Sequence, residues 1–322
     1  MKFIAKKGAL DIPLELIEAQ ENDDIVFFCG AGVSYPAGLP GFDGLVKSVY
    51  EYLSAEQDDL EAQAIKAGFY DRALGLLEAR IKPDNTTSIN LVRQGIISQL
   101  DLQPSANVET HKALLQLSKT QTGKFRLVTT NVDHGFLLAE ESVSKQCDAA
   151  PKLPVPKPHK WASVVHLHGL INKEQDPNGD HLVFTSGDFG SAYLTERWAS
   201  KFVTELFVNF TVVFVGYSIN DPVIRYMTDA IAAEQRQGDA LFKKPYVIAD
   251  TTPKKYDGSI KEWRAKGVEP VLYVKGGAKH PNLHNSIKAW AAHARDGLSS
   301  KERIIKSKAR IAPRAPFPPV SG

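Results

Sequence analysis

The stretch over residues 25–43 constrains the fold more than any other part of the chain. It begins with Ile-Val-Phe-Phe-Cys, an apolar run that predicts a buried strand. Gly-Ala-Gly-Val-Ser follows, and glycines directly after a buried strand let backbone N–H groups face a pyrophosphate, because no Cβ intervenes. Pro36, Gly38, Pro40 and Gly41 then predict an irregular loop that cannot become a helix. Together these features predict a dinucleotide site with a lid, although Gly-Ala-Gly alone also suits a tight turn without a ligand.

Composition excludes several classes of protein. The 322 residues are 43% hydrophobic and 24% charged, which suits one large α/β domain or two smaller ones. The net charge of +2 is too small to produce an overall electrostatic field that would attract the chain to nucleic acid or acidic membranes. The two cysteines, Cys29 and Cys147, rule out a disulfide scaffold and a four-cysteine zinc site within one chain. Without a recognisable signal peptide or a run of ~20 apolar residues, we expect a soluble cytoplasmic protein with no membrane partner.

Buried strands alternate with helices along the chain. Besides the first strand, apolar runs predict strands at 125–130, 164–169, 182–185, 211–216, 245–250 and 270–274. Helical spacing is found at 13–19, 44–53, 58–81, 88–100, 107–118, 188–209, 223–234 and 284–294. This alternation predicts an α/β fold, a Rossmann-like and mostly parallel sheet with helices on both faces.

The domain organisation follows from the same pattern. The helices of about 44–120 lie between the first two strands, so we expect an inserted helical cap within one domain of residues 1–298. Residues 299–322 are basic and then proline-rich, which predicts a tail or a linker.

Polar groups follow four of the predicted strands. These strand ends read Gly-Ala-Gly-Val-Ser at 30–34, Thr-Thr-Asn-Val-Asp at 129–133, His-Leu-His-Gly at 166–169 and Val-Gly-Tyr-Ser at 215–218. Ligands of parallel α/β sheets bind beyond the carboxyl ends of the strands, so we expect the four segments to form one site.

In their order along the chain, these segments resemble the motifs of the Sir2 (sirtuin) family. The family's Gly-Ala-Gly, Thr-Gln-Asn-Ile-Asp, His-Gly and Gly-Thr-Ser motifs resemble residues 30–32, 129–133, 168–169 and 216–218, and its lid motif resembles residues 38–43. The motif Val-Gly-Tyr-Ser-X-X-Asp-Pro at 215–222 is similar to the sequences of the bacterial Sir2-like branch associated with anti-phage defence.

Two departures from the family pattern are informative. Family deacetylases carry a four-cysteine zinc module after His-Gly, whereas residues 170–210 contain no cysteine. His159, His166 and His181 lack the tight paired spacing of zinc ligands, so we expect no zinc. The lid arginine of the family is replaced by Asp43. Loss of the zinc module argues against deacetylation and leaves the NAD+ pocket intact.

Residue chemistry and the resemblance together assign roles. Asn131 can donate and accept hydrogen bonds, which suits a ribose hydroxyl or a water, and His168 is expected to titrate near neutrality and to act as a general base. The resemblance implies that Asp133 accepts from the nicotinamide amide and that Phe42 shields the reacting carbon. It also implies the remaining contacts, with the pyrophosphate at Gly30, Ala31, Gly32 and Ser34 and with the phosphate or adenosine side at Gly216 and Ser218.

Structural alternatives remain for these residues. Asn131 and Asp133 also suit turns or helix caps, and Asp221 suits a cap of the helix that follows it. His168 also suits a histidine buried in the core, the role that we expect for His166. If Asn131 and His168 are catalytic, their truncation to alanine should remove activity and leave the fold intact.

The resemblance implies an NAD+ hydrolase that gives nicotinamide and ADP-ribose, linear or cyclic, and that depletes NAD+ in anti-phage defence. Such an enzyme must be controlled, so we expect a homo-oligomer, a sensor domain or a partner protein. An NAD-dependent protein deacylase and a non-catalytic NAD or ADP-ribose sensor are the alternatives.

Overall fold

The computed structural model describes residues 1–4, 8–81, 89–219, 221–227 and 242–295. These residues form a seven-stranded sheet with the order β3-β4-β2-β1-β5-β6-β7, and every pair is parallel. The predicted Rossmann-like α/β fold is therefore confirmed. The strands are β1 (Ile25–Cys29), β2 (Leu127–Thr129), β3 (Cys147–Ala149), β4 (Val164–His166), β5 (Thr211–Val215), β6 (Tyr246–Thr251) and β7 (Glu269–Val274).

Helices cover both faces of the sheet. They are α1 (Leu14–Glu21), α2 (Phe42–Leu53), α3 (Asp59–Lys66), α4 (Tyr70–Arg80), α5 (Leu91–Gln99), α6 (Glu109–Leu117), α7 (Gly135–Ala139), α8 (Ser186–Gly190), α9 (Trp198–Asn209), α11 (Tyr256–Ala265) and α12 (Pro281–Arg295). Successive side chains of a strand point to opposite faces, so Phe27 packs with α1, α6 and α12, while Phe28 packs with α9 and α11. All five residues of β1 are buried, as the apolar run predicts.

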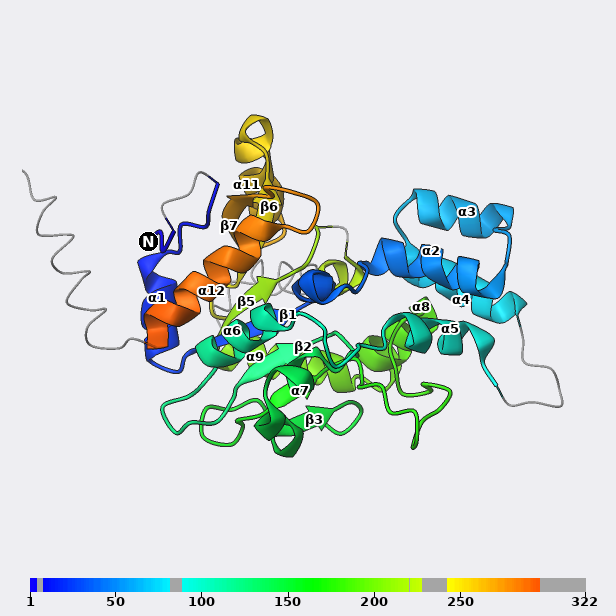
Figure 1. Cartoon of the computed structure of the whole chain (residues 1–322), viewed down its shortest axis with the longest axis horizontal. Helices are drawn as coiled ribbons and strands as arrows, with labels where there is room; N and C mark the ends of the chain where they lie inside the picture. The colour runs from blue at the N-terminus through cyan, green and yellow to red at the C-terminus, as the bar shows by residue number, and fades with distance from the viewer. Residues whose placement is uncertain (5–7, 82–88, 220, 228–241, 296–322) are drawn as a thin grey trace, which may run out of the picture.

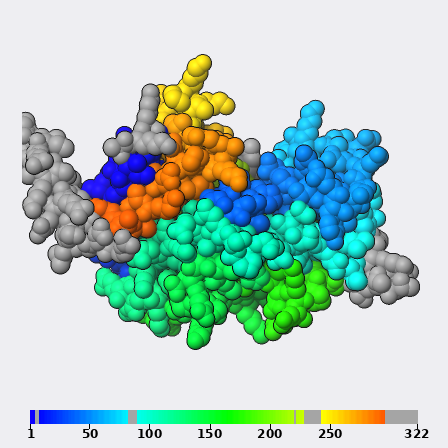
Figure 2. All heavy atoms as spheres, in the orientation of Figure 1, coloured from blue at the N-terminus to red at the C-terminus, as the bar shows by residue number. Residues whose placement is uncertain are grey.

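Each face of the sheet has a hydrophobic core, and a third hydrophobic core lies at one end of the molecule. Helices α2, α4 and α5 contribute most of its buried side chains, and Figure 1 shows α2 to α5 grouped together beside the sheet. Val132, Ile171 and Phe184 join this core from the sheet side, so the cap is packed onto the rest of the chain, as the continuous surface in Figure 2 also shows. Within the segment expected to form the cap, α6 instead packs against α12 over the sheet.

Several predicted elements differ in the structure. The helix predicted over 58–81 is split into α3 and α4 because Gly68 adopts a left-handed φ of 76°. Gly68 N–H bonds to Ile65 O and Phe69 N–H to Ala64 O, the paired bonds of a Schellman motif, which ends a helix. The helix predicted over 188–209 is likewise divided, into α8, a π-helical turn Ser191–Thr195 and α9, with a left-handed Arg197 before α9.

Other differences involve irregular segments. Residues Ala31–Ala37 form a 3-10 helix, so Pro36 does not prevent helical backbone there. A short 3-10 helix has few internal hydrogen bonds, and a proline removes only one donor. Residues 182–185 form no strand, and β3 was missed because its three residues carry no apolar run. Residues 222–227 begin the helix predicted over 223–234, and the rest of it and the tail of 299–322 lie outside the described residues.

Candidate functional site

A cavity lies where the carboxyl ends of β1, β2 and β5 meet. The chain runs from β1 to β2 on one side and later to β5 on the other, so β1 marks the topological switch point at which such sheets bind ligands. The cavity has a volume of about 620 Å³, including space open to solvent. Six of the ten residues predicted for the site line it, namely Ala31, Ser34, Phe42, Asn131, Asp133 and His168.

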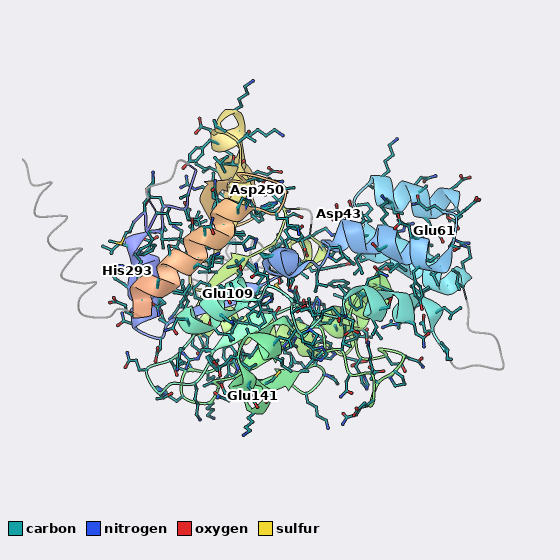
Figure 3. The ribbon with its side chains drawn as sticks, viewed as in Figure 1. Asp43, Glu61, Glu109, Glu141, Asp250 and His293 are labelled. Carbon is teal, nitrogen blue, oxygen red and sulfur yellow. The ribbon has the colours of Figure 1, made fainter. Side chains whose placement is uncertain are left out.

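A second cavity of about 740 Å³ adjoins the first. Gly32, Gly216 and Ser218 line the second cavity, together with Asp43 at the end of α2 nearest the sheet (Figure 3). Both cavities share a set of lining residues, Ala31, Gly41, Phe42, Asp221 and Pro222. The two spaces are therefore adjacent, and Phe42 in the predicted lid is one of the residues at their common boundary.

The glycines of the first turn serve close backbone packing. Gly32 N–H donates to Gly216 O at 2.9 Å, and a Cβ on Gly32 would lie 2.8 Å from Gly216 Cα. Gly30 lines neither cavity; its N–H donates to Val215 O, and a Cβ there would meet the Tyr217 ring at 2.6 Å. The N–H groups of both glycines are thus already bonded within the protein, contrary to the expectation that they face a pyrophosphate.

The Ser34 hydroxyl is the centre of a buried hydrogen-bond network. It donates to Asp133 Oδ2 at 2.9 Å and lies 3.0 Å from Asn131 Nδ2 and 3.2 Å from His111 Nε2. Asp133 Oδ1 also accepts from Gly135 N–H at 2.7 Å. Because a hydroxyl has one proton, Ser34 accepts from both nitrogens when it donates to the carboxylate. Burial lowers the pKa of His111, so this histidine is neutral at pH 7.

Asn131 is fixed by bonds from three directions. Its N–H donates to Thr129 Oγ1 at 3.0 Å, and its amide nitrogen donates to Gly30 O at 3.2 Å and to Ser34. His166 Nδ1 lies 2.8 Å from the Asn131 carbonyl oxygen and donates to it. Since both amide protons are used within the protein, Asn131 offers a ligand its Oδ1 oxygen, which is an acceptor.

His168 lies at the wall of the first cavity and is only 3% exposed. Its Nε2 is 2.9 Å from the Tyr193 hydroxyl, and the Phe189 ring meets its ring edge to face at 5.2 Å. Burial lowers the pKa of His168 to about 3, so the expectation that it titrates near neutrality is wrong. The imidazole is neutral at pH 7, and when Nε2–H donates to Tyr193, Nδ1 holds the free electron pair of a base.

Two other residues have environments that the sequence only partly indicated. His166 is fully buried, and burial lowers its pKa to about 4, in agreement with the core role expected for it. Asp221 accepts from Val223 N–H at 2.9 Å, the capping bond expected of it, and also lines both cavities. Burial raises the pKa of the Asp221 carboxyl to about 7. Sequence reasoning missed His111 and Tyr193; the only signal for His111 is a polar residue on the apolar face of α6.

Within the described ranges, no group of three or more His, Cys, Asp or Glu side chains could hold a metal ion. Across the same ranges, no helix has the length and apolar character needed to cross a bilayer.

Comparisons with known proteins identify two longer relatives, each of which matches this chain over part of its own length. Uncharacterized protein y4cA of Sinorhizobium fredii is 32% identical over 294 residues, which are 87% of this chain and 24% of that protein. NAD(+) hydrolase ThsA of Cytobacillus dafuensis is 22% identical over 221 residues, 67% of this chain and 40% of ThsA. The chain thus spans less than half the length of either curated relative.

Two solved structures are also similar. A crystal structure of a Sir2 homologue–NAD complex is 16% identical with a TM-score of 0.45, covering 91% of this chain and 97% of the other. A Sir2 homologue mutant in complex with ADP-ribose is 15% identical with a TM-score of 0.41, covering 89% and 99%.

The family model described as a SIR2-like domain matches residues 126–271, from β2 into β7. That range contains Asn131, Asp133 and His168 beside the first cavity and Gly216 and Ser218 beside the second. The chain carries a SIR2-like domain.

Proposed function

We propose that this chain is an NAD+ hydrolase that cleaves the nicotinamide–ribose bond to give nicotinamide and ADP-ribose. The observation that carries the proposal is the convergence of Ser34, Asn131, Asp133 and His168 around one cavity from three separate strand ends. The relative named as an NAD(+) hydrolase and the motif resemblance give the substrate class.

The two adjacent cavities suit the two ends of a dinucleotide. The nicotinamide and its ribose would occupy the first cavity, and the adenosine side would occupy the second, beside Gly216 and Ser218. Phe42 lies at the junction and would shield the reacting carbon from solvent. Ala31 and the lid would then contact the pyrophosphate between the cavities.

Bond cleavage passes through an oxocarbenium-like state, which the protein must orient. Asn131 Oδ1 would accept from a ribose hydroxyl, because both of its amide protons are already bonded. Asp133 would accept from the nicotinamide amide while Ser34 and Gly135 hold its carboxylate. The neutral His168 would take a proton from the attacking water or a ribose hydroxyl, and Tyr193 would fix the ring.

A role in anti-phage defence by NAD+ depletion is the biological part of the proposal. A freely active hydrolase would be toxic, so assembly, a fused sensor domain or a partner would hold it inactive. The isolated chain should then turn over NAD+ slowly, and self-assembly or a partner should raise the rate.

The test is chromatography of NAD+ incubated with the purified protein over several hours. We expect equimolar nicotinamide and ADP-ribose, or cyclic ADP-ribose with the same nicotinamide yield. Product formation only with an acylated lysine peptide would establish the deacylase instead. Binding of NAD+ by calorimetry without any product, under assembling conditions too, would establish a sensor.

A further inference from the structure

One guanidinium joins the cap to the wall of the first cavity. Arg93 of α5 is buried, with 8% of its side chain exposed. Nε donates to Glu78 of α4 at 2.7 Å, and Nη2 donates to Asp188 of α8 at 2.7 Å. Nη1 donates to the carbonyl oxygens of Gly179 and Leu182 at 2.8 and 3.0 Å. Glu78 belongs to the cap. The other three partners, two backbone carbonyl groups and the Asp188 carboxylate, lie outside the cap.

Three of the four groups that accept from Arg93 belong to the segment 179–189, which forms a wall of the cavity. Val183, Phe184 and Phe189 of this segment line the first cavity. Asp188 Oδ2 accepts from the N–H groups of Phe184 and Thr185 at 3.0 and 2.9 Å, so the carboxylate bound by Arg93 also fixes the backbone of the wall.

The same wall supports His168. Val183 N–H donates to the His168 carbonyl at 3.1 Å, and the Phe189 ring packs against the His168 imidazole. Because residues 182–185 form no strand, few ladder bonds hold the segment in place. Its apolar side chains pack in the cores, and the guanidinium and the Asp188 carboxylate provide polar contacts that fix its backbone.

We propose that Arg93 is a positioning residue for the active site, through which the helical cap sets the geometry of the 179–189 wall and of His168. This inference rests on the proposed function, since turnover of NAD+ is one of its readouts. A partner or an assembly contact that shifts α5 would alter the cavity through this side chain. The cap would thereby act as the control element of the hydrolase.

The chemistry of the site requires arginine. Four donated bonds leave in a planar fork toward two carboxylates and two carbonyl groups, and an ammonium group cannot reproduce that geometry. Removing one partner of a buried ion pair leaves the other charge uncompensated.

Arg80 provides a matched control within the same cap. Its Nε and Nη2 donate to Glu61 at 2.9 Å each, and the Glu61 carboxylate is fully buried on the side of the cap away from the sheet (Figure 3). Neither Arg80 nor Glu61 lines the first cavity. Arg80→Met therefore disturbs the cap without releasing the wall.

The experiment compares Arg93→Met, Arg93→Lys and Arg80→Met in the full chain. Amide hydrogen exchange followed by mass spectrometry should show faster exchange over residues 179–189 in both Arg93 variants and not in Arg80→Met. NAD+ turnover should fall about 10- to 100-fold in kcat/KM for the Arg93 variants, with a lower kcat as His168 is misplaced. Arg80→Met should keep kcat and KM within about twofold of the unaltered chain.

A triple variant separates positioning from stability. Arg93→Met with Glu78→Gln and Asp188→Asn removes both of the charges that the guanidinium compensates, so the melting temperature should recover. The carbonyl groups of Gly179 and Leu182 still lack their donor, so exchange and kcat should not recover. Recovery of kcat along with the melting temperature, or equal exchange in the Arg93 and Arg80 variants, would overturn the positioning role. Absence of turnover in the unaltered chain would count against the hydrolase, while the exchange comparison would still decide the role of Arg93.

Discussion

Truncation of His168 tests the catalytic assignment, and its consequences follow from the buried position of the ring. His168→Ala removes an imidazole that is 3% exposed and packs against Phe189 and Tyr193. The change opens a cavity and leaves the Tyr193 hydroxyl without its 2.9 Å partner. Together these losses should lower the free energy of unfolding by about 3 kcal/mol. The expectation from sequence that this truncation leaves stability unchanged therefore does not suit a side chain so deeply buried.

A second substitution separates chemistry from folding. His168→Gln fills more of the space and keeps a hydrogen bond within reach of Tyr193, so it should lower the unfolding free energy by only about 1 kcal/mol. Neither alanine nor the glutamine amide can act as a base at neutral pH. Both variants should therefore lose ~10²–10⁴-fold in kcat for NAD+ hydrolysis, although their stabilities differ.

His284 supplies the matched control. It is a buried histidine of α12 whose Nδ1 lies 3.1 Å from Thr110 Oγ1, and it lines neither cavity. His284→Ala should lower stability as His168→Ala does, and the folded fraction should hydrolyse NAD+ at the normal rate.

The assay combines denaturant unfolding, which gives the fraction folded, with chromatographic measurement of nicotinamide release. Normal kcat per folded molecule in His168→Gln would refute the assignment of His168 as the base. A rate loss in each variant that merely tracks its loss of folded protein would show that His168 has a structural role only.

Three further predictions concern stability, backbone geometry and metal content. Burial raises the pKa of Asp221 from 3.8 to about 7, so the folded state holds this proton more tightly than the unfolded state does. The contribution of this proton to the free energy of unfolding is fully present below pH 4 and is lost as the pH rises to about 7. Urea unfolding at several pH values should show that Asp221→Asn removes this part of the fall in stability with pH. An unchanged dependence of stability on pH in the variant would contradict the assignment. Gly216→Ala should lower the unfolding free energy by at least 1–2 kcal/mol in thermal melts, since Gly216 has a φ of 79° and a Cβ would lie 2.7 Å from Val33 N; a stability equal to that of the unaltered chain would show that the turn adapts. The purified protein should contain no stoichiometric zinc by elemental analysis, because residues 170–210 contain no thiolate ligands, and one zinc per chain would disprove this.

Local physical chemistry explains which parts of the fold could be predicted. Apolar runs of five and four residues predicted β1 and β5, because strands buried on both faces carry few polar side chains. The helix predicted over 58–81 failed because an amphipathic stripe continues across Gly68, although the backbone there turns left-handed. The sequence pattern records which residues are buried and does not record where the helix axis changes direction.

The amino-acid sequence by itself determined the parallel α/β class and the strand ends that carry Asn131 and His168. The spacing of apolar residues and the point at which an apolar run ends are local properties of the sequence. Only the tertiary structure decided the protonation state of His168, which depends on Phe189 and Tyr193, residues more than twenty positions away in the chain. Desolvation is a property of everything that surrounds a group, so no motif can encode it. The bonds of Ser34 to His111 and of Arg93 to Asp188 have the same origin, since packing brings together side chains whose separation in sequence carries no signal.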